Sequence, residues 1–130
     1  MTEKRIEIRW RDLDAFGHVN QAVYLTFAEE VLDDWFRARL GLAAGAVWDY
    51  VAKRTTLEYH AELRQTDGHV VGRVTGVRLG TSSVTAELEL RRGDGTLAAT
   101  VETVVVAFDL AERRARPLSD EERLRLREPA

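Results

Sequence analysis

The longest amphipathic pattern in the chain lies between Gln21 and Leu40, a stretch that contains neither glycine nor proline. Apolar residues recur there at intervals of three and four, the spacing that places side chains on one face of an α-helix. The positions on this face are Val23, Phe27, Ala28, Val31, Leu32, Trp35 and Phe36. Leu25 and Ala38 widen the apolar surface. We therefore predict a helix over 21–40 that other parts of the protein cover on several sides.

Turn-forming residues stand at both ends of this stretch. Gly17 supplies backbone freedom for a tight turn before the helix, and Asn20 is a preferred residue type for the N-cap position. Gly41 and Gly45 indicate the end of the helix and a following loop.

Five other segments alternate between apolar and polar residues, which is typical of strands with one buried face. They span residues 4–10, 47–63, 69–79, 83–91 and 96–109. Turn signals at 66–68, 80–82 and 93–95 separate the last four segments. Short turns join antiparallel neighbours, so the pattern predicts one antiparallel sheet of five strands.

The alternation also assigns the strand faces. The residues expected to share a face are Ile6, Ile8 and Trp10 in the first strand, Val51, Leu57, Tyr59, Ala61 and Leu63 in the second, and Val71, Val77 and Leu79 in the third. Gly72 and Gly76 fall on the other face of the third strand. A glycine inside a strand often marks the close approach of another chain segment or a ligand.

A second, short helix is expected after Pro117. Ser119 followed by Glu122 forms a capping-box pattern, and the highly charged sequence beyond it predicts a helix on the surface. One amphipathic sheet curling around one apolar helix buries both elements. We therefore predict a single α+β domain over 1–130, with an antiparallel five-stranded sheet wrapped around a long central helix and a short C-terminal helix.

Composition narrows the class of function. A formal net charge of −3 over 130 residues gives no reason to expect a nucleic-acid partner. The chain has no cysteine, which excludes disulfides, thiolate catalysis and cysteine-based zinc sites. No signal-peptide pattern and no apolar run of membrane-spanning length is seen, so we expect a cytoplasmic protein without a membrane partner.

An acid precedes the start of the predicted helix by about one turn of chain. Helix starts carry unpaired N–H groups and a partial positive charge, so Asp14 and the amides near Gln21 could supply an oxygen nucleophile or base and an oxyanion donor. The alternative is that Asp14 caps its own turn. For Asp12 we favour that structural interpretation.

Several residues in a fixed order carry a family resemblance. They are Arg9, the run Asp12-x-Asp14-x-x-Gly17-His18-Val19-Asn20, then Tyr24 and Glu29, with weaker support from Leu57-Glu58-Tyr59 and from Gly80-Thr81-Ser82-Ser83. On these residues the chain resembles the hotdog-fold acyl-CoA thioesterases of the 4-hydroxybenzoyl-CoA thioesterase type. The resemblance implies the hotdog fold, an acyl-CoA substrate, no metal or organic cofactor, and a homodimer or homotetramer with sites at the subunit boundary.

The resemblance also implies roles for individual residues. Asp14 is the expected catalytic carboxylate, as nucleophile or as general base on water, within a catalytic segment that also contains Gly17, His18, Asn20 and Gln21. Some branches of the family carry a histidine where this chain has Gln21, so proton transfer is left to water, to His18 or to a residue of a second copy. His18 could equally be a packed turn residue, and Asn20 is more simply a helix cap.

Further residues are candidates for substrate binding. Tyr24 lines the acyl pocket or packs in the core, and Glu58 faces the site across an interface or lies on the surface. The candidates for contacts with CoA phosphates or pantetheine are Arg73, Arg78, Ser82 and Ser83. Glu29 is expected near the dimer centre, and His60 and His69 are interpreted as surface histidines, so no metal site is expected.

Two other functions are compatible with the same residues. One is hydrolysis of acyl-carrier-protein thioesters, and the other is acyl-CoA binding without turnover. Acyl length, aromatic preference and the choice between dimer and tetramer depend on how two copies meet, which the sequence does not fix.

Overall fold

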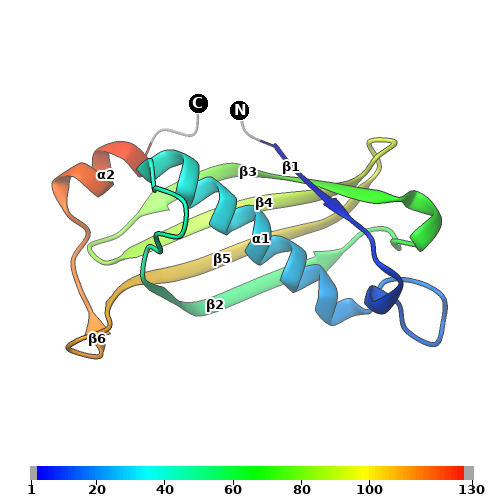
Figure 1. Cartoon of the computed structure of the whole chain (residues 1–130), viewed down its shortest axis with the longest axis horizontal. Helices are drawn as coiled ribbons and strands as arrows, with labels where there is room; N and C mark the ends of the chain where they lie inside the picture. The colour runs from blue at the N-terminus through cyan, green and yellow to red at the C-terminus, as the bar shows by residue number, and fades with distance from the viewer. Residues whose placement is uncertain (1–2, 128–130) are drawn as a thin grey trace.

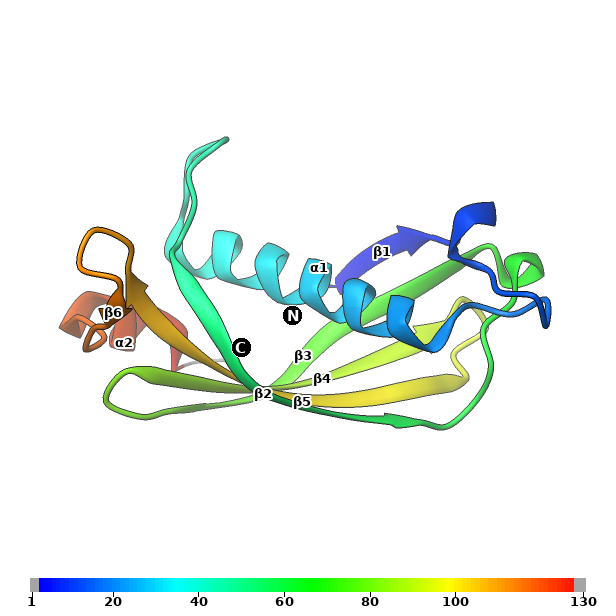
Figure 2. The same ribbon diagram turned by 90° about the horizontal axis from the view of Figure 1, so that it is seen from below.

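A curved antiparallel sheet wraps around helix α1, which lies along its concave face in the computed structural model (Figures 1 and 2). The structure describes residues 3–127. The strands follow the order β1-β3-β4-β5-β2, with a two-residue strand β6 paired to β5. They are β1 (Glu3–Glu7), β2 (Tyr50–Tyr59), β3 (His69–Leu79), β4 (Ser83–Arg92), β5 (Leu97–Asp109) and β6 (Arg114–Ala115). The helices are α1 (Gln21–Leu40) and α2 (Asp120–Leu126), and two 3-10 turns are η1 (Trp10–Asp12) and η2 (Gln65–Asp67).

Helix α1 begins and ends at the predicted residues. The Asn20 side chain accepts a hydrogen bond from the Ala22 amide, and Gly41 ends the helix in the left-handed conformation with φ of 62°. Six of the seven apolar positions predicted for its buried face are buried, together with Tyr24. The hotdog architecture and the α+β class predicted from the sequence are thus confirmed.

Gly72 of β3 allows the sheet to approach α1 closely. A methyl group built at this position would overlap the Val31 side chain of the helix and would lie 3.1 Å from Leu90. The predicted close approach at this glycine is therefore real, and its partner is the central helix. Gly76 lies on the opposite face, where such a methyl group would meet the Glu87 carboxylate at 2.9 Å.

Two irregularities reverse the faces predicted for β2 and β3. The register of β2 shifts between Ala52 and Arg54, and that of β3 shifts between Val74 and Gly76. Each shift is a β-bulge, which inserts one residue and exchanges the two faces beyond it. Val51 and Val71 therefore do not share a face with the later apolar residues of their strands, as the sequence had suggested.

The first two strands are also shorter than predicted. Strand β1 ends at Glu7, and Trp10 lies in η1 with 78% of its surface exposed. Strand β2 ends at Tyr59, so residues 60–63 form a separate segment that returns toward the start of α1.

Helix α2 packs more closely than its charge suggested. Ser119 and Glu122 form the predicted capping box, but Leu126 is fully buried and Leu118 nearly so. The Trp48 indole donates a 2.6 Å hydrogen bond to Glu122, which ties the helix to the loop before β2. Among residues 3–127, no helix is long and apolar enough to cross a membrane.

Candidate active site

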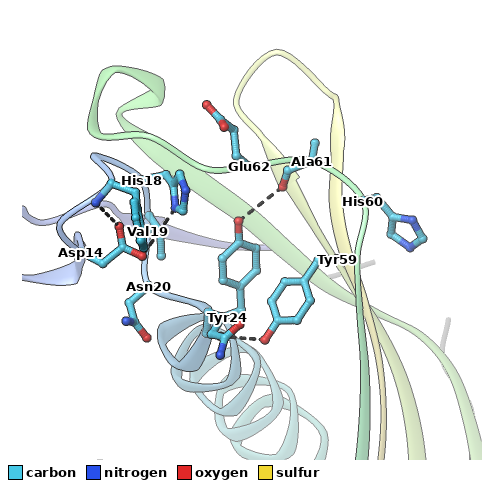
Figure 3. Close-up of a pocket in the computed structure, with 11 residues that line it drawn as sticks. Asp14, His18, Val19, Asn20, Tyr24, Tyr59, His60, Ala61 and Glu62 are labelled. Carbon is cyan, nitrogen blue, oxygen red and sulfur yellow. Dashed lines mark hydrogen bonds and ion pairs between the residues drawn. The ribbon is translucent and has the colours of Figure 1, made fainter.

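A cleft of about 580 Å³ opens beside the first turn of α1 (Figure 3). Its walls come from the loop before α1, from the helix start and from the end of β2 with the segment that follows. The lining residues are Asp14, Phe16, His18, Val19, Asn20, Gln21, Tyr24, Tyr59, His60, Ala61 and Glu62. The cleft thus gathers five of the residues proposed from the sequence for catalysis or acyl binding.

The loop before α1 is closed by backbone hydrogen bonds across its base. Leu13 and Val19 form an isolated bridge, and the Asp14 amide donates to the His18 carbonyl at 3.0 Å. The Gly17 amide donates to the Asp14 carbonyl at 3.2 Å, and Gly17 has a φ of 83° that favours glycine. Gly17 therefore shapes the turn that carries Asp14, without lining the cleft itself.

Hydrogen bonds to Asp12 hold the same loop in place. Asp12 is 2% exposed. Its carboxylate accepts hydrogen bonds from the Arg9 amide at 2.8 Å and from the Arg9 guanidinium at 3.1 Å. Its carbonyl accepts from the Asn20 amide at 2.8 Å. These contacts match the structural interpretation of Asp12.

The two oxygens of the Asp14 carboxylate have different surroundings. Oδ1 accepts a 2.9 Å hydrogen bond from the Phe16 amide, the contact expected of a turn acid. Oδ2 lies 3.6 Å from His18 Nδ1, and the Asp14 side chain is 19% exposed. The hydrogen bond from Phe16 holds the Asp14 side chain in place, and Oδ2 lies at the cleft (Figure 3).

Two of the first three backbone amides of α1 donate hydrogen bonds within the described part of the chain, and one does not. The Ala22 amide donates to the Asn20 side chain at 2.9 Å, and the Val23 amide donates to the Asn20 carbonyl at 2.9 Å. Within residues 3–127, no hydrogen-bond partner is found for the Gln21 amide. An unpaired N–H at a helix start carries partial positive charge and suits an anion.

Two tyrosines form the wall opposite Asp14. The buried Tyr24 hydroxyl donates to the Ala61 carbonyl at 3.3 Å and accepts from the Leu63 amide at 3.0 Å. Burial raises the pKa of the Tyr24 phenol, so it stays protonated. The Tyr59 hydroxyl donates to the Gln21 carbonyl at 2.9 Å, and the two rings pack edge to face with centroids 4.9 Å apart.

Other residues proposed from the sequence for substrate binding do not line this cleft. Glu58 lines a different concavity, on the outer face of the sheet, together with Glu87 and Glu102. Arg73 pairs with Glu89 at 2.6 Å, and Arg78 lies 3.9 Å from Glu87 and from Glu102. Ser82 lies in the β3–β4 turn and Ser83 begins β4, and this turn is at the opposite end of the sheet (Figure 1). Contacts of these residues with CoA stay predictions.

Sequence reasoning missed the segment that follows β2. The sequence places Tyr59 and Ala61 on one face of the predicted second strand and Tyr59 in the family pattern, but it assigns neither of them, nor Glu62, to the site. His60 had been interpreted as a surface histidine. Its ring forms a hydrogen bond with the Thr100 hydroxyl at 3.0 Å and points away from the cleft in Figure 3.

No group of three or more potential metal ligands is present among the described residues.

Sequence comparison identifies the family of the chain. The model of the thioesterase-like superfamily matches residues 8–126, nearly the whole sequence. None of the curated proteins matches the chain.

Three solved structures illustrate the likeness in fold. One is described as a predicted thioesterase from Bacillus stearothermophilus, with 25% identity, a TM-score of 0.86 and coverage of 98% of this chain and 95% of that one. A thioesterase from Thermus thermophilus, solved with coenzyme A and Zn, has 28% identity, a TM-score of 0.80 and coverage of 95% and 90%. A 1,4-dihydroxy-2-naphthoyl-CoA thioesterase from Synechocystis shares the fold at 18% identity, with a TM-score of 0.79 and coverage of 95% and 93%.

Proposed function

The chain belongs to the thioesterase-like superfamily and is a thioester hydrolase; we propose that it cleaves an acyl-CoA at the cleft beside the start of α1. The observation that carries this proposal is that Asp14 and Gln21 line one cleft, and that the Gln21 amide has no hydrogen-bond partner within residues 3–127. The Thermus relative solved with coenzyme A supports the choice of CoA as the thiol.

The proposed reaction needs one oxygen attack and one stabilised oxyanion. Either Asp14 removes a proton from water as the water oxygen bonds to the thioester carbon, or the Asp14 carboxylate attacks that carbon and the resulting anhydride is hydrolysed. In both routes the carbonyl oxygen becomes negative and the carbon–sulfur bond then breaks. The products are a carboxylic acid and free CoA, and no metal or organic cofactor takes part.

The Gln21 amide is the proposed oxyanion donor. One aimed donor typically contributes about 2.7–4 kcal/mol to transition-state stabilisation, whereas an exposed charge near a helix end gains only about 0.3–1 kcal/mol. The position of this single N–H should therefore matter more than the general field of α1. Asn20 acts beside it by pairing the Ala22 amide and shaping the first turn.

His18 is the proposed proton carrier for the departing thiolate. Its Nδ1 lies 3.6 Å from Asp14 Oδ2, and its ring stacks loosely on Phe16, with centroids 6.0 Å apart. In the general-base route, the proton that Asp14 takes from water can pass to His18 across this separation, and His18 then protonates the departing sulfur. Tyr24 and Tyr59 supply the apolar wall for the acyl group, because both hydroxyls are bonded to backbone atoms.

The proposed active assembly is a homodimer, with the tetramer as the larger alternative. Strand β2 is a ten-residue edge strand, and its side chains from Val51 to Thr56 are exposed. Long exposed edges are usually covered or paired. Beside it, Leu25 and Glu29 of α1 border a small groove between the helix and β2. A second copy placed along this edge would cover the groove.

Replacement of Asp14 tests the proposed function. Purified protein would be assayed with acetyl-, hexanoyl-, palmitoyl- and benzoyl-CoA, and thiol release recorded. Asp14→Asn should lose at least 100-fold in kcat on every CoA ester that the wild type hydrolyses, since its amide is a poor base and nucleophile. Asp33→Asn is the control: Asp33 lies on α1, its one ionic partner within residues 3–127 is Arg37, and the variant should keep wild-type rates.

Two results would contradict parts of this proposal. Wild-type rates in Asp14→Asn would remove Asp14 from the reaction. Faster turnover of acyl-carrier-protein thioesters than of the matching CoA esters would replace CoA as the thiol. Rapid-quench analysis in ¹⁸O-labelled water separates the two routes, because only the nucleophilic route places label in Asp14.

A further inference from the structure

Two tyrosine hydroxyls join the start of α1 to the end of β2 in opposite directions. Tyr24 reaches from the helix to the backbone of Ala61 and Leu63. Tyr59 reaches from the strand to the Gln21 carbonyl in the first helical turn. A backbone hydrogen bond from the Val19 amide to the Leu63 carbonyl, at 2.7 Å, runs beside them.

The two contacts serve different parts of the protein. Tyr24 is 4% exposed and belongs to the core, so its hydroxyl fixes buried backbone. Tyr59 is 51% exposed and lies along the cleft, where it adds little to the core. Its hydroxyl has one partner within the described residues, and that partner is the carbonyl of the residue that presents the unpaired amide.

The first residue of a helix is its least restrained, because its N–H has no intrahelical partner. Here the preceding residue, Asn20, is fixed by the Asp12 carbonyl through its amide and by the Ala22 amide through its side chain. The Tyr59 hydroxyl adds a restraint from the other side of Gln21. Together these contacts restrain the backbone on both sides of Gln21, a residue that lines the cleft.

We infer that Tyr59 is a positioning residue for the reaction, whose hydroxyl holds Gln21 so that its amide meets the developing oxyanion. This inference rests on the proposed function. Tyr59 acts through the protein backbone and donates no hydrogen bond to substrate. Its contribution therefore appears in the chemical step rather than in substrate binding.

Tyr59→Phe removes only the hydroxyl and tests this assignment. Complete loss of an oxyanion donor typically costs about 10²–10³ in kcat, so a misdirected donor should lower kcat by about tenfold, with KM changed by less than about twofold.

Tyr50→Phe is the matched control on the same strand. The Tyr50 ring packs against Phe36 and Trp48, and within residues 3–127 its hydroxyl has no hydrogen-bond partner, so kcat should stay at the wild-type value. Thermal melting of each variant separates a change in rate from partial unfolding.

A double variant tests whether Tyr59 acts through the Gln21 amide. Gln21→Pro deletes this N–H at the first helical position, where proline is well tolerated, and Asn20 already has the extended ψ of 138° that a residue before proline prefers. Adding Tyr59→Phe to Gln21→Pro should lower kcat no further, because the group that Tyr59 positions is gone.

The outcomes separate the inference from the proposed function. Wild-type kcat in Tyr59→Phe, or the same tenfold fall in both backgrounds, would overturn the positioning role while Asp14→Asn still reports on the reaction. A fall in kcat that follows the loss of folded protein would overturn it as well. A wild type that hydrolyses none of the CoA esters would overturn the proposed function and this inference together.

Discussion

Asp12 and Asp14 are two residues apart, yet the backbone places them in opposite roles. Asp12 is buried and bonded to Arg9, whereas one Asp14 oxygen faces the cleft beside His18. The sequence favoured a structural role for Asp12 and a reactive one for Asp14. The structural role is visible in the contacts of Asp12, and the reactive role of Asp14 stays a proposal.

Loss of the Asp12 carboxylate should destabilise the fold. Asp12→Ala leaves the Arg9 amide without its partner, and hydrogen bonds to charged groups contribute about 1.5–3 kcal/mol. We expect the free energy of unfolding in urea to fall by about that amount. Asp67→Ala is the comparison, because Asp67 accepts from the Arg64 amide in the same pattern on η2, with a side chain that is 21% exposed and lies 3.8 Å from Arg92, against 3% exposed for Asp12. An equal loss in both variants would show that burial of Asp12 adds nothing.

At the scale of elements, the prediction from the sequence was most accurate for α1. Asn20 and Gly41 carry local cap chemistry that neighbouring residues decide, so both ends were predicted correctly. The bulges in β2 and β3 were not predictable in the same way. A bulge depends on how a strand fits its partner and the helix beneath it, and neither Lys53 nor Thr75 is a residue type that signals one.

The attachment of α2 should depend on pH through Glu122. The Arg116 guanidinium is the main cause that lowers the pKa of Glu122 from 4.5 to about 2. Because the pKa is lower in the folded than in the unfolded protein, the ionised group stabilises the fold above pH 4.5, and this stabilisation is lost as the pH falls toward 2.

Comparison with Glu122→Gln isolates this effect from the other carboxylates. At pH 7 the wild type should melt several degrees higher than the variant, and the difference should shrink between pH 4.5 and pH 2. The indole of Trp48, which donates to Glu122, offers a fluorescence signal for the same transition. A difference in melting temperature that stays constant over this range would contradict the assignment.

At the scale of the whole molecule, the cleft depends on contacts between residues 37 and 38 positions apart in the chain, Tyr24 with Ala61 and Gln21 with Tyr59. The Asp14 loop and the start of α1 were recognised from local motifs, but Tyr59 and Glu62 reach the cleft only because β2 forms the sheet edge and its end lies near the start of α1. Periodicity assigns a residue to a face and cannot say which distant segment it meets. For the same reason, the sequence could not show that Arg73 and Arg78 form ion pairs with Glu89 and Glu87 of the neighbouring strand β4.

The proposed dimer predicts different behaviour for two exposed leucines. Leu25, 40% exposed, borders the groove between α1 and β2, and Leu124, 62% exposed, lies on α2. Leu25→Lys should place a charge in the subunit interface and shift the mass measured by light scattering from dimer to monomer, with loss of activity. Leu124→Lys should change neither. A wild type that is monomeric and fully active would rule out the dimer as the working unit.

The central claim is that an acid and a helix-start amide act together in one cleft. Its most direct test is the ratio of kcat between Gln21→Ala, which keeps the amide, and Gln21→Pro, which removes it, on the CoA ester that the wild type hydrolyses fastest. The proline variant should be slower by about 100-fold or more, the effect of losing an oxyanion donor, with both variants folded. Equal kcat values in two folded variants would contradict it.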